Sequence, residues 1–230
     1  MNKPFMSFSL GQTRLTWDVC WLVTAPLGLW LVASVYVPLF GGNLNPWETW
    51  LLTLLIGVLC LVSLVAHASA HLFVARKCKG EIISYLPIYP LGDASQVWPP
   101  TRTPRDDFLI AVSGPLSSGV IAAGAYLIWN MQQGTYLNLI MLFLVFFNSG
   151  VALFNLIPFF PLDGGRLFRA ICWGLLERPA AATVWAARGG KGISLLLLLW
   201  SIFLLIQHTR HSLWAGGATL PASALQRARR

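Results

Sequence analysis

Four long stretches without a charged side chain dominate the sequence. They run over residues 19–47, 49–75, 108–162 and 192–209. A helix needs about 20 mostly apolar residues to cross a bilayer, so each stretch is close to that length or above it, and the third can hold two spans. The pattern predicts an all-α polytopic membrane protein whose polar segments are turns and loops.

We expect about six transmembrane segments. Their approximate limits are 17–40, 46–76, 108–130, 136–157, 165–176 and 181–207, the fifth being shorter than the others. Two prolines and two glycines in residues 155–165, NLIPFFPLDGG, predict a broken helix there. We interpret residues 1–230 as a single integral membrane domain with a core at about 47–176, flanked by the N-terminal span 17–40 and the C-terminal span 181–207.

The segment 80–98, GEIISYLPIYPLGDASQVW, departs from the helical pattern. Prolines and a glycine interrupt its isoleucines and tyrosines. This pattern favours a short β-hairpin-like segment with an open edge. The prolines of the following WPPTRTPRDD stop any helix, and Asp106 and Asp107 suit the first turn of the next one, where we expect a solvated helix cap.

Composition supports a membrane protein and suggests its orientation. Of the 230 residues 56% are hydrophobic and 10% charged, against roughly 25% charged in an average soluble domain. The net charge of +8 comes from Lys and Arg at the ends of the apolar runs, which fits the positive-inside rule better than nucleic-acid binding. We expect a prokaryotic cell membrane, with the N-terminus and the carboxyl end of the second span in the cytoplasm. The basic tail QRARR favours a cytoplasmic C-terminus.

Two histidines lie inside an apolar run, and an aspartate directly follows another. His67 and His71 are four residues apart near the end of the second span and so share one helix face. By itself such a pair is more often hydrogen-bonded than metal-binding. Asp163, however, lies in the broken segment, where a charge needs a partner and irregular backbone needs a protein-lined cavity. Two histidines and one carboxylate make the three-ligand set of a catalytic zinc site, with a fourth position for water.

Two motifs resemble those of the site-2 protease family of intramembrane zinc metalloproteases. His67-Ala-Ser-Ala-His71 resembles the HExxH helix of that family, and NLIPFFPLDGGR resembles its second motif, in which Asn, Pro and Asp-Gly recur. The resemblance implies regulated cleavage of transmembrane proteins or peptides inside the bilayer. It implies His67, His71 and Asp163 as zinc ligands, with Asn155 holding the substrate or orienting the site.

The resemblance also implies how a substrate binds. The substrate helix would unwind and add as a strand beside the 80–98 segment, bringing its peptide bond to the zinc. Asp93, in that segment, would contact the substrate or serve as a turn residue.

Two positions depart from the family pattern. The general base of the family, a Glu directly after the first histidine, is Ala68 here, and losing a positioned general base lowers a rate by about 10²–10⁴. That Glu is not a metal ligand, so we expect the chain to bind zinc while being nearly inactive. Ser118 stands where the family often has Asn, which puts in question one polar contact near the substrate.

Three interpretations follow from these departures. The first is a site-2-type protease disabled at Ala68 by a deliberate change. The second is a natural pseudoprotease that keeps its metal and groove to bind transmembrane helices, and the sequence leaves these two open. The third is a metal or small-solute transporter, which the absence of an internal repeat disfavours.

Overall fold

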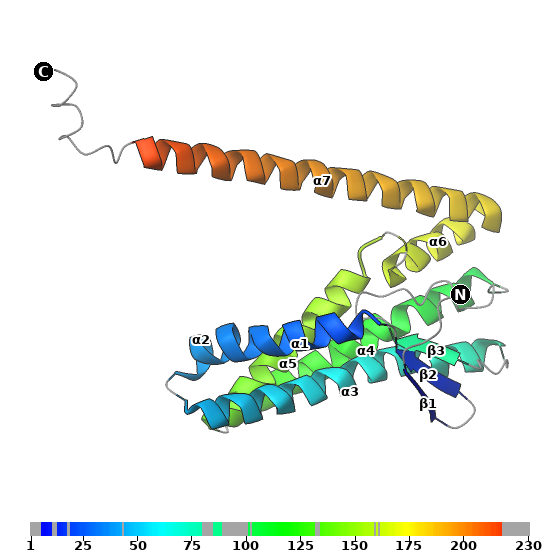
Figure 1. The fold of residues 1–230 in the computed structure, drawn as a ribbon. Coiled ribbons are helices and arrows are strands. Elements are labelled where there is room, and N and C mark those ends of the chain that lie inside the picture. Colours follow the sequence, from blue (N-terminus) through cyan, green and yellow to red (C-terminus); the bar gives the residue numbers. More distant parts are fainter. Residues whose placement is uncertain are drawn as a thin grey trace, which may run out of the picture.

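The computed structural model describes most of the chain. The described residues are 6–10, 13–17, 19–42, 44–79, 85–88, 101, 103–131, 134–158, 160 and 162–217. Among them, five helices are long and apolar enough to cross a membrane: Trp21–Gly41, Pro46–Cys78, Pro104–Asn130, Thr135–Asn155 and Pro179–Gln207. Four of these lie together as a bundle, and the fifth extends away from it (Figure 1).

The first span is one helical run in three parts. These are α1 (Trp21–Leu31), a π-helical turn η1 (Val32–Tyr36) and α2 (Val37–Gly41). The run ends at Gly42, whose φ of 67° lies in the left-handed region that glycine adopts without a steric penalty. The expected start at Trp17 is wrong, because Trp17 belongs to a strand.

The third span, α4 (Pro104–Asn130), lies at the centre of the bundle and packs against α3 (Pro46–Lys79), α5 (Thr135–Asn155) and α6 (Asp163–Leu176). Of its most apolar window 44% is buried, against 28% in α3 and 22% in α5. Its buried positions are mostly small: Ala111, Ser113, Gly114, Ser118, Ala122 and Ala125. Small side chains let neighbouring helices approach closely, which is the main source of helix packing energy in lipid.

The fifth predicted segment, expected at 165–176, is α6, which begins at Asp163, two residues earlier than expected. Its 14 residues are about 21 Å long, too short for a bilayer core of roughly 30 Å. The last helix, α7 (Pro179–Gly217), has 39 residues and follows α6 directly. The broken helix expected before α6 is present, since α5 ends at Asn155.

A small sheet lies at the end of the bundle where α3 finishes. Its strands, in the order β1-β2-β3, are β1 (Met6–Leu10), β2 (Thr13–Trp17) and β3 (Tyr85–Ile88). β1 and β2 are antiparallel, and β3 is parallel to β2 with Tyr85 opposite Arg14. The segment 80–98 therefore adds one strand, β3, to the hairpin that β1 and β2 form. The expected pairing within 80–98 lies outside the described residues and stays a prediction.

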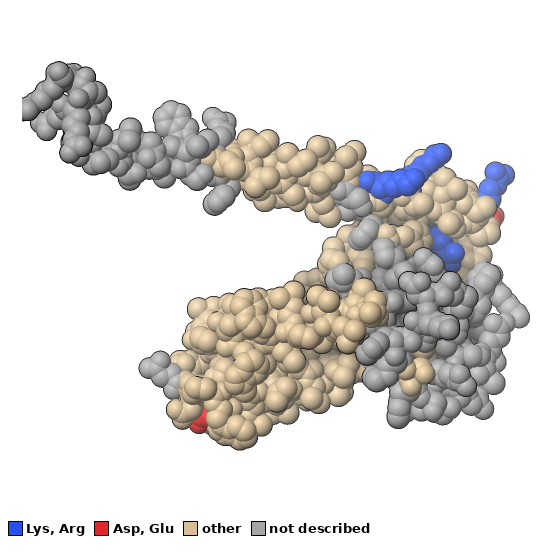
Figure 2. Space-filling view, viewed as in Figure 1, with Lys and Arg blue, Asp and Glu red and all other residues tan. Residues whose placement is uncertain are grey.

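The largest described core cluster is apolar and lies between η1, α2, α3, α4 and α5. Its buried members are Val32, Val37, Leu52, Ile56, Ala125, Leu139, Ile140 and Leu144. The outward faces are also apolar, and Figure 2 shows the bundle almost free of charge, with Lys and Arg gathered where α6 meets α7. A surface of this kind is stable in lipid and not in water.

Candidate metal centre

Three side chains from two helices converge at the end of α3. Nε2 of His71 lies 3.1 Å from Oδ2 of Asp163, and Nε2 of His67 lies 3.3 Å from the same oxygen. The two Nε2 atoms are 3.3 Å apart. Only 11% of the His67 side chain, 4% of that of His71 and 13% of that of Asp163 is exposed. The structure thus brings together the three residues singled out in the sequence, although 92 residues separate His71 from Asp163.

The spacing of these three atoms suits a zinc ion. Ligands at 2.0–2.2 Å from a tetrahedral zinc lie roughly 3.3–3.6 Å from one another. The observed separations of 3.1–3.3 Å are within a few tenths of an ångström of that value. A set of two imidazoles and one carboxylate is also a usual donor set for catalytic zinc. These residues could therefore hold zinc with little movement.

Each imidazole ring is oriented by a contact of its other nitrogen, Nδ1. Nδ1 of His71 lies 2.7 Å from the carbonyl oxygen of Ile110, which can only accept, so Nδ1 carries a proton and Nε2 is the nitrogen that could bind a metal. Nδ1 of His67 lies 2.9 Å from Oγ of Ser118, whose side chain is fully buried. Such outer hydrogen bonds fix the tautomer and ring orientation of metal-binding histidines. Ser118 therefore contacts a histidine of the centre, a role that the sequence did not suggest.

Gly114 on α4 provides the space between the two ring nitrogens. A Cβ atom at this position would meet Nε2 of both histidines, 2.6 Å from that of His67 and closer still to that of His71. A side chain of any size at position 114 would therefore collide with both imidazole rings, so the centre depends on the missing Cβ.

The first turn of α6 approaches the end of α5 closely. A Cβ on Gly164 would collide with the backbone carbonyl oxygens of Leu156 and Ile157. Only glycine permits this approach, which brings Asp163 next to α3. Burial by itself raises the pKa of the Asp163 carboxyl, but the nearby imidazoles of His71 and His67 and their hydrogen bonds hold that pKa below its usual range. Asp163 is therefore a carboxylate at neutral pH, the form that binds metal.

Asp107 is not the solvated helix cap that the sequence predicted. Its side chain is fully buried and pairs with Arg166 and Arg169 of α6, whereas Thr103 caps α4 by accepting from the backbone N–H of Asp106. The sequence held one sign of this buried pairing: Arg166, an arginine three residues after Asp163. A cation buried at that depth needs an acidic partner.

Ala68 is part-buried on α3, beside an apolar cluster that includes Trp21 and Leu72. Among the described carboxylates, none replaces the missing base: Glu48 lies at the other end of α3, where it accepts from Tyr136, and Asp107 is held by arginines. The chain therefore has the proposed ligands without an acid or base positioned for proton transfer in the described residues.

Two further residues, Asn155 and Asp93, were predicted to act at the site. Asn155, at the end of α5, donates from Nδ2 to the carbonyl oxygen of Val151 in its own helix, 2.9 Å away. Asp93 lies outside the described residues. The roles in substrate binding expected for these two residues stay predictions.

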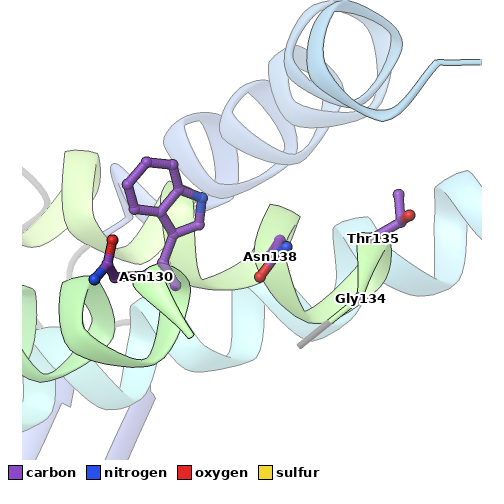
Figure 3. A pocket seen from close by; sticks show the side chains of 5 residues that line it. Asn130, Gly134, Thr135 and Asn138 are labelled. Carbon is purple, nitrogen blue, oxygen red and sulfur yellow. The ribbon is translucent and has the colours of Figure 1, made fainter. Parts of the chain in front are cut away.

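A separate hollow lies at the turn between α4 and α5 (Figure 3). It has a volume of about 360 Å³ and is lined by Trp129, Asn130, Gly134, Thr135 and Asn138. Trp129 follows Gly114 by 15 residues, which is about 22 Å along a helix. No ionisable side chain is among the residues that line this hollow, and it is not part of the metal centre.

Comparison with known proteins agrees with the geometry. The family model of peptidase family M50 matches residues 131–199, which contain Asp163 and the broken segment. Rip3 of Mycobacterium tuberculosis, named as a candidate zinc metalloprotease, is 32% identical over 184 residues, which cover 78% of this chain and 45% of Rip3. The zinc metalloprotease MJ0392 of Methanocaldococcus jannaschii is 33% identical over 152 residues, covering 63% of this chain and 42% of that protein.

The chain spans less than half the length of these two relatives. The similarity to Rip3 nevertheless includes both histidines and Asp163 wherever it begins, because it covers 78% of the chain. The fold matches that of the solved site-2 protease from Methanocaldococcus jannaschii with a TM-score of 0.55 and 23% identity, over 87% of this chain and 86% of that one. The chain is thus similar to peptidase family M50 in sequence and to a site-2 protease in fold, and the relatives that it matches are named as zinc metalloproteases.

Proposed function

We propose that this chain is the scaffold of an intramembrane zinc protease that acts on transmembrane substrates, with His67, His71 and Asp163 as its zinc ligands. The observation that supports this most strongly is the convergence of the three ligand atoms, 3.1–3.3 Å apart, beside a break between apolar helices. Bound zinc would supply Lewis-acid polarisation of the scissile carbonyl and activation of water. The protein supplies the orientation of the ligands, through Ser118 and Ile110, and an enclosed site.

A substrate segment is proposed to add as a strand beside β3. Among the described strands, β3 lies at the edge of the sheet, so one of its sides faces away from β2. An extended peptide gains backbone hydrogen bonds by pairing with such an edge. Unwinding of the substrate helix would be required first, because a helical backbone has no free groups for that pairing. Asn155 and Asp93 stay candidates for contacts with the substrate.

Ala68 makes the chain as it stands a poor catalyst. A Glu at this position would take a proton from water and return it to the leaving amine, and no described carboxylate can do so here. Two explanations remain: a deliberately disabled protease, or a natural pseudoprotease that holds transmembrane helices without cutting them. The intact ligand set and its outer hydrogen bonds, which a pure binding protein would not need, favour a scaffold built for catalysis.

We further propose a prokaryotic cell membrane, with the metal end of α3 on the cytoplasmic side. Arg76, Lys77 and Lys79 follow the last apolar residues of α3, and the basic residues near the junction of α6 and α7 gather at the same end of the molecule (Figure 2). An excess of Lys and Arg on one side is typical of the cytoplasmic face.

Restoring the base tests the proposed activity. Ala68→Glu, reconstituted in detergent or lipid with model transmembrane substrates, is expected to cleave them at least about 100-fold faster than the starting chain. Chelation by phenanthroline is expected to stop the cleavage and added zinc to restore it. Zinc-independent cleavage, or no cleavage of a range of substrates by a zinc-loaded Ala68→Glu chain, would contradict the protease function and favour the pseudoprotease.

A further inference from the structure

We propose that Asp107 is a positioning residue for the metal centre. Its buried carboxylate ties α6 to α4 through Arg166 and Arg169, and this tie holds Asp163, the first residue of α6, against the two histidines. The inference rests on the proposed function, in which Asp163 is a zinc ligand.

Both oxygens of Asp107 are occupied by α6. Nη2 of Arg166 lies 3.0 Å from Oδ1, while Nε and Nη2 of Arg169 lie 2.9 and 2.7 Å from Oδ2. Arg169 also reaches Oγ1 of Thr101, 3.3 Å away. The Asp107 side chain is 0% exposed and that of Arg166 only 6%, so water does not replace these contacts. Charge-assisted pairs of this kind are strong and directional.

The position of Asp163 depends on contacts around the first turn of α6. Leu162, just before it, is extended, so α6 is not a continuation of α5 and its direction is not set by that helix. Arg166 lies one turn after Asp163 and fixes that turn from the side of α4. Gly164 fixes it from the side of α5, by its close approach to the carbonyl oxygens of residues 156 and 157.

One face of α4 therefore organises the whole centre. Asp107, Ile110, Gly114 and Ser118 follow one another at intervals of three or four residues and so lie along one side of the helix. Asp107 binds α6, the carbonyl of Ile110 and the hydroxyl of Ser118 bind the histidines, and Gly114 leaves room between the rings. Ligands that come from α3 and from α6 are thereby positioned on a common support.

The test measures zinc affinity in the full chain by competition with a chelating dye, for Asp107→Asn, Asp163→Asn and the double variant. We expect Asp107→Asn to weaken zinc binding by about 10–100-fold, as removal of an outer partner of a metal ligand does. In the Asp163→Asn background the same change should cause no further loss, because the ligand that it positions is gone. Asp106→Asn, one position earlier and in neither of the ion pairs of Arg166 and Arg169 with Asp107, is the matched control and should leave the affinity unchanged.

A second variant covers the risk that Asp107→Asn leaves too much unpaired positive charge for the chain to fold. Arg166→Gln leaves Asp107 with both contacts from Arg169, and it should show the same loss and the same non-additivity with Asp163→Asn. Unchanged affinity in both variants, or an equal loss with and without Asp163, would overturn the positioning role. If Asp163→Asn alone leaves zinc affinity intact, the proposed ligand set fails, and this inference fails with it.

Discussion

Single residues at the centre differ in how far the sequence reveals them. His67, His71 and Asp163 were predictable because an ionisable group inside an apolar run needs a partner. Gly114 and Ser118 were not predictable as parts of the centre, because small residues in a membrane helix indicate packing in general. Asp107 was misassigned for a related reason: an acidic residue in the first turn of a helix is typical of a cap. Only the ion pair with Arg166, which forms in the folded protein, distinguishes a buried acidic residue of this kind from a solvated helix cap.

Gly114→Ala tests whether the centre needs the close approach of α4 to the two imidazoles. The added methyl group would collide with Nε2 of both histidines, so we expect zinc affinity to fall by about 100-fold or more, a larger loss than removal of an outer hydrogen bond causes. Gly119→Ala, on the same helix, has no atom within 4 Å of the new Cβ and should bind zinc normally. Dye competition on both purified variants measures this, and a Gly114→Ala chain that binds zinc as tightly as the starting chain would place the metal elsewhere.

At the scale of elements, the hydrophobic pattern located every long helix but did not settle which of them cross the membrane. α6 has an apolar face and follows a break. Its 14 residues, however, are too few to cross a bilayer. The N-terminal strands also had a signal, since Met6, Phe8 and Leu10 alternate with Ser7 and Ser9. Their pairing with β3, about 70 residues later, is non-local and could not be read from that alternation.

Five spans predict that the two ends of the helical region lie on opposite faces of the membrane. This replaces the expectation from the basic tail, because α7 starts at the end that we propose to be cytoplasmic and its 39 residues reach about 58 Å, well beyond one bilayer core. An alkaline phosphatase fused after Gly217 should therefore be active outside the cytoplasm, like a control fusion after Met131, and one fused after Lys79 should be inactive. Activity after Lys79, or inactivity after Gly217, would contradict this topology.

At the scale of the molecule, a lipid-facing bundle carries one enclosed polar centre near one of its ends. Its described surface is apolar, so the chemistry depends on the few ionisable groups that α3, α4 and α6 bury together. The chain combines three side chains that could hold zinc with an alanine at the proposed position of the base. This combination predicts a protein that holds zinc and turns substrate over slowly or not at all.

Metal analysis of the purified chain tests this central claim most directly. We predict one zinc per chain for the protein with Ala68 as it stands, and the same stoichiometry after Ala68→Glu, because position 68 is not a ligand. Asp163→Ala should lose most of the bound zinc under the same conditions. A chain without zinc, or one whose zinc content is unchanged by Asp163→Ala, would contradict the account.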